Sequence, residues 1–287
     1  MARTLEPYQL VERSIITKYR KVLWNPFIEA VKRYEMIQPG DRIAMCISGG
    51  KDSMLLAKLM QQLQKHSDFP FELVFLVMDP GYNELNRQQI ESNAALLNIP
   101  VTIFESDIFE VADSAGKSPC YLCARMRRGY LYSRAQELGC SKIALGHHFN
   151  DVVETTLISM FYGSQLQAML PKLHSTNFEG MTLIRPLYCV HEDDIIAWAR
   201  DNSLEFIQCA CRLTERSAAD TGDVNVSKRK EIKLLLRRLR QGNPNIEKSI
   251  FNSIHAVALD TMPGFKTGGV EHSFLERFNA MESTEDE

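Results

Sequence analysis

The chain has 287 residues, 45% of them hydrophobic, and carries 33 Lys and Arg against 36 Asp and Glu, a formal net charge of −3. This balance excludes a polycation, and the hydrophobic content suffices for one large domain or one domain with appendages. The longest apolar run, at residues 73–78, is too short to span a bilayer, and the first residues hold no apolar stretch of the signal-peptide type. We therefore expect a cytoplasmic protein with no membrane partner.

Residues 1–37 carry apolar side chains at helical spacing and predict an N-terminal helical extension. After it, short and nearly continuous apolar segments alternate with helical ones, which is typical of buried parallel strands with helices on both faces. The sequence therefore predicts an α/β fold, a doubly wound parallel five-stranded sheet, in a domain at residues 38–212. Strands are expected at 42–48, 71–79, 101–106, 142–148 and 181–190, and helices at 52–66, 83–97, 120–138, 151–162 and 191–202.

Residues 213–287 are expected to form a basic helical region followed by a loose tail. Segment 228–240 carries seven Lys and Arg against one Glu, which suits a polyanionic partner such as RNA. The same segment also fits a solvated amphipathic helix with its leucines toward the core, and both interpretations can hold together. The chain after residues 262–269 looks loose, and its last residues are acidic.

Three polar loops follow predicted strands, at residues 48–53, 79–83 and 146–151. In open α/β sheets, ligands bind beyond the carboxyl ends of the strands. We therefore expect these three loops to converge on one crevice.

The first of these loops reads SGGKDS, between an apolar strand and a helix. Its two glycines let the backbone approach a ligand closely, and the helix N-terminus favours an anion. Lys51 adds a positive charge and Ser53 a hydroxyl group. Asp52 would repel phosphates unless a cation bridges them, which indicates Mg²⁺. The alternative is a tight strand–helix turn with Asp52 as a helix cap.

Seven cysteines, an odd number, argue against a disulfide scaffold. Cys46, Cys140 and Cys189 sit among apolar residues and are expected in the core. The remaining four form a cluster in the sequence, as a C-x-x-C pair near residue 120 and a C-x-C pair near residue 210. In a reducing compartment, such a cluster indicates metal ligands or catalytic thiols.

Cys120, Cys123 and Arg127 share one helical stripe, and a helix N-terminus lowers thiol pKa values. Zinc sites, redox disulfides and iron–sulfur clusters all use C-x-x-C, but the later C-x-C makes a four-thiolate zinc site awkward. Three cysteines suit a [4Fe–4S] cluster with one iron left open to a substrate sulfide. We expect Cys209 as the third ligand because it directly follows an apolar segment, with Cys211 as the alternative.

The hexapeptide SGGKDS resembles the PP-loop signature of ATP-pyrophosphatases, which have a fold similar to adenine nucleotide alpha-hydrolases. The C-x-x-C pair, then ARMRRGYLYSRAQELG, KIALGHHFNDVVETTLISMFYG, PLYC and a late cysteine look like the TtcA family. This resemblance runs from the N-terminal helix through residues 243–265. It implies an ATP-dependent tRNA sulfurtransferase that makes 2-thiocytidine by adenylating a base oxygen and replacing it with sulfur carried on a cluster.

The resemblance also implies the cofactors ATP, Mg²⁺ and a [4Fe–4S] cluster, the substrate tRNA, and a sulfur donor such as a cysteine desulfurase. Homodimers are common among such enzymes. Asp52, Asp151 and Arg127 are the expected catalytic residues. Residues matching the family's ATP contacts are Ser48, Gly49, Gly50, Asp52, Ser53, Met78, Gly146 and Asp151, beside Lys51, and those matching its cluster ligands are Cys120, Cys123 and Cys209.

The chain departs from the family pattern in two places. Asn150 replaces the first aspartate of a D-D pair, and the late cysteines are C-x-C rather than C-x-x-C. Asp151 and Glu154 also fit a helix capping box. Two alternative functions stay open: another PP-loop enzyme, such as a different thiolase or a lysidine-type ligase, or a non-enzymatic protein that binds ATP and a cluster.

Overall fold

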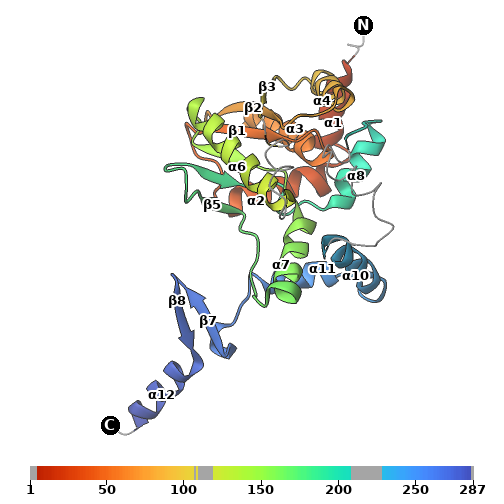
Figure 1. Ribbon diagram of the computed structural model, residues 1–287. Helices are drawn as coiled ribbons and strands as arrows, with labels where there is room; N and C mark the ends of the chain where they lie inside the picture. Colours follow the sequence, from red (N-terminus) through yellow and green to blue (C-terminus); the bar gives the residue numbers. More distant parts are fainter. Residues whose placement is uncertain (1–4, 107, 109–118, 208–227, 286–287) are drawn as a thin grey trace. The chain divides into compact units, whose positions relative to one another are not determined.

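A computed structural model of the chain describes residues 5–106, 108, 119–207 and 228–285, without the side chains of residues 119–125 and 281–285. The chain divides into two compact units, Met1–Lys233 and Leu234–Glu287. The first unit contains the central sheet, and the second contains a small hairpin (Figure 1).

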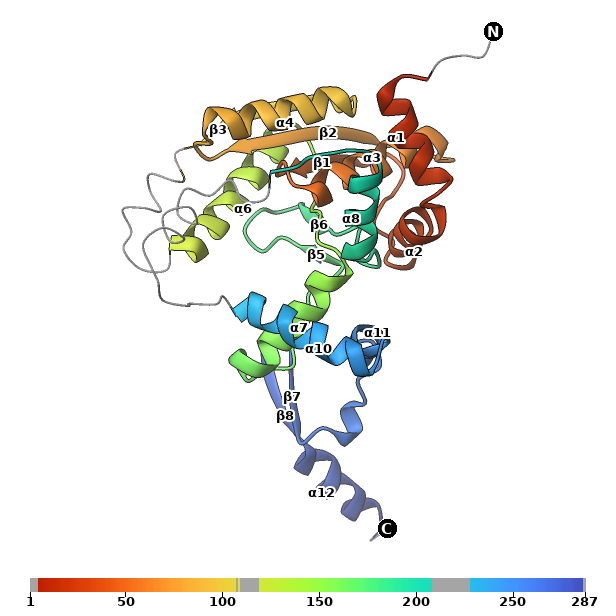
Figure 2. The same cartoon turned by 90° about the vertical axis from the view of Figure 1, so that its right-hand side faces the viewer.

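The central sheet has six strands in the order β3-β2-β1-β4-β6-β5. Five of them are parallel, as expected, and β5 pairs antiparallel with β6 at one edge. This short sixth strand was not expected, because three residues are too few for a visible alternation. Figure 2 shows β2, β1, β6 and β5 from top to bottom. The strands are β1 Arg42–Ile47, β2 Glu72–Asp79, β3 Val101–Glu105, β4 Lys142–Ala144, β5 Lys172–His174 and β6 Thr182–Ile184.

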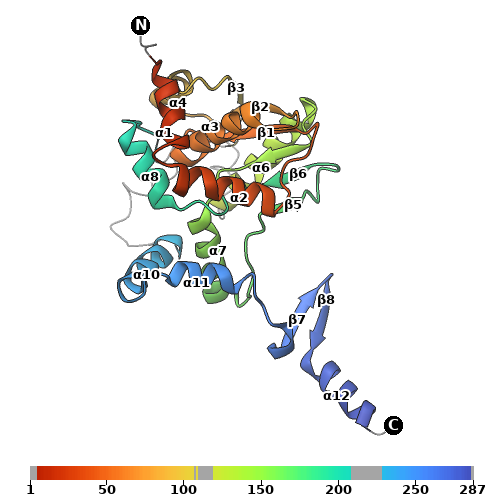
Figure 3. The same cartoon turned by 180° about the vertical axis from the view of Figure 1, so that it is seen from behind.

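Helices cover both faces of this sheet, so the doubly wound prediction is confirmed. Helix α3 packs on β1 and β2, whereas α6 packs on β2 and β4. Helix α6 faces the viewer in Figure 1, and α1, α2, α3 and α8 face the viewer in Figure 3. Among the described residues, no helix combines the length and the apolar character that a bilayer crossing requires. The helices of this unit are α1 Pro7–Ile16, η1 Arg20–Trp24, α2 Asn25–Arg33, α3 Lys51–His66, α4 Glu84–Leu96, α6 Pro119–Glu137, α7 Phe149–Gly163 and α8 Glu192–Asp201.

Helix α3 is buried on almost all sides because it lies between the sheet and the helices α1 and α8. Its Lys58 side chain is fully buried and must therefore find hydrogen-bond partners inside the protein. The ammonium group donates to Glu12 Oε1 of α1 at 2.8 Å and to the carbonyl oxygen of Leu97, just after α4, at 2.7 Å. Lys58 thus joins three helices at one point.

The second unit begins within helix α10, Lys228–Gly242, and continues with α11 Ile246–Ser253, η2 Leu259–Thr261, β7 Gly264–Thr267, β8 Val270–Ser273 and α12 Phe274–Glu285. Strands β7 and β8 form a hairpin whose turn places Gly268 at φ +57° and Gly269 at φ +83°. The residues expected as a loose tail thus include a hairpin and a helix in this structure. The hairpin escapes pattern analysis because most residues of both strands are exposed and show no alternation of apolar side chains.

Replacing Lys58 with alanine should lower the free energy of unfolding by about 3–5 kcal/mol, because the change leaves the largely buried Glu12 carboxylate without its buried partner. Lys65 pairs with the same carboxylate at 2.9 Å, but its side chain is 51% exposed. Lys65→Ala should therefore cost less than about 1 kcal/mol. Urea unfolding of both variants tests the prediction, and equal losses would contradict it.

Candidate active site

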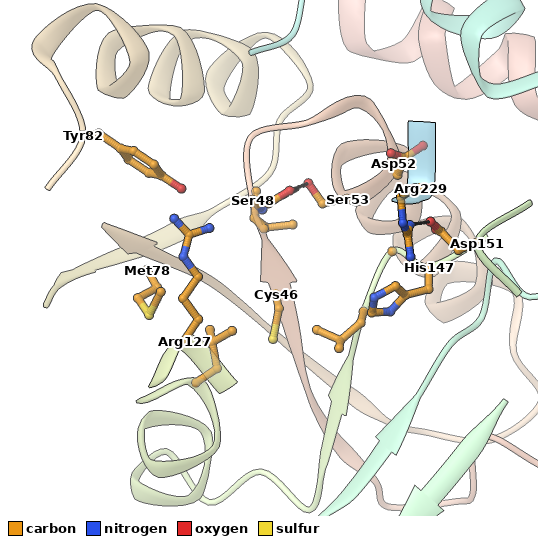
Figure 4. Close-up of a pocket in the computed structure, with 14 residues that line it drawn as sticks. Cys46, Ser48, Asp52, Ser53, Met78, Tyr82, Arg127, His147, Asp151 and Arg229 are labelled. Atoms are coloured by element: carbon orange, nitrogen blue, oxygen red, sulfur yellow. Dashed lines mark hydrogen bonds and ion pairs between the residues drawn. The ribbon is translucent and has the colours of Figure 1, made fainter. Parts of the chain in front are cut away.

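A pocket of about 390 Å³ opens at the carboxyl ends of the parallel strands, a size suited to a small ligand. The loops at residues 48–53, 79–83 and 146–151 all contribute to its wall, which confirms the predicted convergence. Figure 4 shows side chains from these loops and from α6 around a common space. The pocket is lined by Cys46, Ile47, Ser48, Asp52, Ser53, Met78, Tyr82, Arg127, Leu131, Leu145, Gly146, His147, Asp151 and Arg229.

The loop between β1 and α3 turns through Gly49, whose φ is +82°. A Cβ atom at this position would lie 2.5 Å from Ile90 Cγ1 and 2.7 Å from Ile207 Cδ1, so a side chain has no room. Gly50 is the N-cap residue of α3 and has an extended backbone. Beyond it, the first N–H groups of α3 lack partners within the helix, as at every helix N-terminus, and favour an anion.

Two serines hold this loop together. The Ser48 N–H donates to Ser53 Oγ at 3.1 Å, and the Ser53 hydroxyl donates to the Gly50 carbonyl at 2.9 Å. Ser53 is almost fully buried. Its hydroxyl therefore fixes the turn in this structure, and a contact with phosphate stays a prediction.

The loop after β4 packs directly onto the start of α3. A Cβ atom on Gly146 would lie 3.1 Å from both the Asp52 carbonyl carbon and the Ser53 backbone nitrogen. Backbone atoms cannot move aside as the end of a side chain can, so glycine is needed for this close packing. The contact brings the N-termini of α3 and α7 together at the pocket.

Helix α7 begins two residues earlier than predicted, at Phe149, with His148 as its N-cap. The His148 N–H donates to Asp151 Oδ2 at 3.1 Å, and the Asp151 N–H donates to His148 Nδ1 at 3.4 Å. The alternative that the sequence allowed, a capping box between Asp151 and Glu154, is therefore not formed. Asp151 closes a box with His148 instead, and this fixes its carboxylate at the pocket wall.

Three carboxylates surround the buried His148 ring. The Nε2 atom lies 3.5 Å from Asp151 Oδ2, 3.9 Å from Asp52 Oδ1 and 3.9 Å from Glu192 Oε1. Burial opposes ionisation of Asp151, but His148 and Arg229 outweigh it and hold the pKa of Asp151 below its usual value. Asp52 Oδ1 is buried and has no hydrogen-bond partner among the described residues. Such an oxygen fits a cation that arrives with a ligand.

Lysine and arginine side chains balance these carboxylates. Lys51 Nζ lies 3.1 Å from Asp52 Oδ2 and 3.1 Å from Glu192 Oε1. Although burial acts against the charged form, the two carboxylates raise the pKa of Lys51. From α10, Arg229 Nη1 lies 2.6 Å from Asp151 Oδ1, and Lys233 Nζ lies 3.1 Å from Glu192 Oε2.

Glu154 lies behind Asp151 on α7 and is 2% exposed. Burial raises the pKa of Glu154 to about 7, although Lys233 and Arg229, each 3.6 Å away, act in the opposite direction. The Glu154 carboxyl group is therefore partly protonated near neutral pH.

Asn150 stands where the family pattern has an aspartate, and it is almost fully buried. Its side-chain oxygen accepts the N–H of Glu192, the first residue of α8, at 2.9 Å. An aspartate here would add a negative charge beside Glu192, Asp151 and Glu154. The neutral amide of Asn150 holds the backbone N–H of Glu192 without adding that repulsion.

The opposite wall of the pocket is less charged and includes Met78, Tyr82 and Arg127. Leu131, another lining residue, packs against the cluster that contains Met78. Asp79 shapes the loop that carries Tyr82, because its Oδ1 accepts the Tyr82 N–H at 2.7 Å. These side chains offer an apolar surface and one guanidinium group.

His147 also lines the pocket, on the side of Asp151 and Arg229. Burial, and after it the charge of Arg185, lowers the pKa of His147 to about 4. The imidazole is therefore neutral at neutral pH and adds no charge to the pocket.

The predicted site residues fall into three groups. Asp52, Asp151, Arg127, Ser48, Ser53, Met78 and Gly146 line the pocket together. Gly49, Gly50 and Lys51 shape or flank the loop without lining the pocket. Cys120 and Cys123 belong to α6, but their side chains lie outside the described residues, as do Cys209 and Cys211 entirely.

Sequence reasoning missed Arg229, Glu192 and Tyr82. Arg229 belongs to the basic segment 228–240, which was assigned to RNA, and its spacing gave no sign of a pocket residue. Tyr82 lies in the loop at residues 79–83, which was expected at the crevice. Its place in that loop was the one sign that it could line the pocket. Glu192 follows a histidine at a helix start and has no motif of its own.

The strand–loop–helix geometry, the carboxyl-edge pocket and the paired aspartates define a PP-loop nucleotide-binding protein. Residues 17–214 match the family described as the PP-loop domain. The chain is 36% identical over 240 residues to a tRNA-cytidine(32) 2-sulfurtransferase of Geobacter sulfurreducens, covering 83% of this chain and 90% of that protein. It is 38% identical over 234 residues to the protein of that name from Alkalilimnicola ehrlichii, covering 79% of this chain and 70% of that protein. The chain belongs to the TtcA family of PP-loop proteins.

A solved structure has a similar fold. The U34-tRNA thiolase NcsA from Methanococcus maripaludis, determined with its [4Fe-4S] cluster, superposes with a TM-score of 0.62 at 19% sequence identity. The match covers 84% of this chain and 80% of that one. At this identity the likeness concerns the fold.

Gly49→Ala should lower the free energy of unfolding by about 2 kcal/mol, because it forces a left-handed backbone on alanine and a Cβ onto buried Ile90. Gly50→Ala is the matched control, since its φ is −80° and the nearest atom to its Cβ, Ser48 Oγ, is 3.6 Å away. It should cost less than about 1 kcal/mol. Urea unfolding measures both, and an unchanged Gly49→Ala variant would refute the clash.

Glu154→Gln should gain stability relative to the wild type as pH rises. Because the folded pKa of Glu154 lies above its unfolded value, this group stabilises the fold below about pH 4.5, and that contribution is lost as pH rises through 7. Glutamine cannot ionise, so the difference between variant and wild type should grow by about 3 kcal/mol from pH 4.5 to 8. Urea unfolding across this range measures it, with Glu137→Gln on exposed α6 surface as a control. A pH-independent difference would count against the raised pKa.

Proposed function

We propose that this chain thiolates tRNA at the expense of ATP. It transfers the AMP part of ATP to a base oxygen, the O2 atom of cytidine, and then replaces that oxygen with sulfur. The observation that carries the proposal is a PP-loop pocket with two facing aspartates in a chain whose relatives are named tRNA-cytidine(32) 2-sulfurtransferases.

The phosphates of ATP would lie at the N-terminus of α3, where the absence of side chains on Gly49 and Gly146 keeps backbone N–H groups accessible. The adenine would extend toward Met78 at the end of β2, on the less charged wall. Lys51 would add positive charge near the phosphates.

Asp52 and Asp151 are the proposed ligands of Mg²⁺, which neutralises phosphate charge when bound. Mg²⁺ commonly uses one or two carboxylates together with substrate phosphates. The two aspartates fit this pattern, since both line the pocket and flank His148. In addition, Asp52 Oδ1 has no hydrogen-bond partner among the described residues.

In the first step, the base oxygen attacks the α-phosphorus and the bond to the bridging oxygen breaks, so that pyrophosphate leaves. The attached AMP then makes that oxygen a good leaving group, and sulfur takes its place at the ring carbon. Arg127, on the opposite wall from Asp151, is proposed to contact phosphate or the tRNA near the reacting base. The base has to leave its stack to reach the pocket.

Cys120, Cys123 and Cys209 are the proposed ligands of a [4Fe–4S] cluster. A cluster held by three cysteines has one iron open to sulfide, which is the chemistry it would supply. Among the described residues, no group of three or more His, Cys, Asp or Glu is placed to hold a metal. A cluster on this chain would therefore need the cysteine side chains outside the described residues. The sulfur would come from a donor such as a cysteine desulfurase.

Mass spectrometry of digested tRNA from cells with and without the gene tests this function. We expect 2-thiocytidine to disappear and to return with the wild-type gene, but not with Asp52→Ala or Cys120→Ala. Loss of a different thionucleoside would keep the chemistry and change the target base. An unchanged set of thionucleosides would overturn tRNA thiolation, and thiolation by Cys120→Ala would overturn the cluster ligands.

A further inference from the structure

Arg229 comes from the far end of the first unit, yet its side chain lines the pocket formed by the PP-loop. Its Nη1 atom lies 2.6 Å from Asp151 Oδ1, and its Nη2 atom donates to Thr155 Oγ1 at 3.5 Å. In Figure 4 the dashed line to Asp151 marks this ion pair. The first turn of α10 therefore contributes to the pocket wall.

Arg229 lies on the charged side of the pocket, near the N-terminus of α3. Its partner Asp151 lies 3.5 Å from His148 Nε2, and that nitrogen lies 3.9 Å from Asp52 of the PP-loop helix. The less charged wall, with Met78 and Tyr82, is the other side of the pocket. With the phosphates at α3, Arg229 is at the end of the pocket where the last two phosphates would lie.

The chemistry of a guanidinium group suits that place. It stays charged at any physiological pH and carries five N–H donors in a planar fork that matches phosphate oxygens. The carboxylate groups of Asp151 and Glu154, at 2.6 Å and 3.6 Å, and the Thr155 hydroxyl hold the side chain in this structure, and its 45% exposure leaves it open to an incoming anion. Asp151 orients the guanidinium before any ligand arrives.

We propose that Arg229 binds the β- and γ-phosphates of ATP and stabilises pyrophosphate as it leaves. When the bond between the α-phosphorus and the bridging oxygen breaks, its electron pair stays on pyrophosphate. The positive charge of Arg229 offsets that developing negative charge. This inference rests on the proposed function, and it makes a residue of the basic segment part of the ATP site rather than of the RNA surface.

Binding of inorganic pyrophosphate and of AMP, each measured calorimetrically with Mg²⁺, separates this role from a structural one. Arg229→Ala should weaken pyrophosphate binding about 10- to 100-fold, since a charge-assisted contact to phosphate is lost, and leave AMP binding unchanged. Arg229→Lys should recover part of the loss. Arg134→Ala removes an arginine that is 40% exposed and paired with Glu137, and it should change neither affinity.

Kinetics give a second readout. Because the charge on pyrophosphate develops in the transition state, Arg229→Ala should lower kcat for tRNA-dependent pyrophosphate release about 100-fold. Wild-type pyrophosphate affinity in Arg229→Ala would overturn the proposal, and so would an equal loss of AMP affinity, which would indicate a role in the fold. Wild-type protein that forms no AMP from ATP and tRNA would overturn the proposed function instead. The comparison of pyrophosphate binding by the wild type and Arg229→Ala would still test the role of Arg229.

Discussion

The site depends on one steric constraint, the packing of the backbone at Gly146 against the first turn of α3. Two strand–helix junctions can meet this closely only if one of them has no side chain at the point of contact. Their meeting places Asp52 and Asp151, one from each junction, around the same imidazole of His148. A larger residue at position 146 would separate the two helix N-termini and enlarge the distance between the aspartates.

This close packing also concentrates negative charge. Asp52, Asp151, Glu154 and Glu192 lie near one another, and none of their side chains is more than 28% exposed. The fold balances them with lysine and arginine from α3 and α10 and with hydrogen bonds such as that from His148 to Asp151. A divalent cation that arrives with a polyphosphate would add positive charge beside these carboxylates. The charge arrangement thus favours a nucleotide–metal complex over the bare nucleotide.

The sequence allowed the parallel sheet and the three converging loops to be predicted, because both follow from local patterns and from the rule for strand ends. Partners across the fold could not be predicted in this way. The predicted contact of Ser53 with phosphate stays a prediction, and in this structure its hydroxyl donates to the Gly50 carbonyl of its own turn. Arg229 reaches Asp151 from a distant helix, and no spacing in the sequence encodes that contact. The hairpin around Gly268 was missed because most residues of its strands are exposed and show no alternation of apolar and polar side chains. The cluster cysteines stay a prediction from motif alone.

The edges of the central sheet have a consequence for self-association. One edge is β5, three residues long and antiparallel, with the Lys172 ammonium tied to the carbonyl of Glu35 at 2.8 Å. The other is β3, which ends at Glu105 in an ion pair with Arg87. Short strands and charged side chains resist the pairing of edge strands between molecules. These two edges of the central sheet should therefore resist pairing with a strand of another copy of the chain.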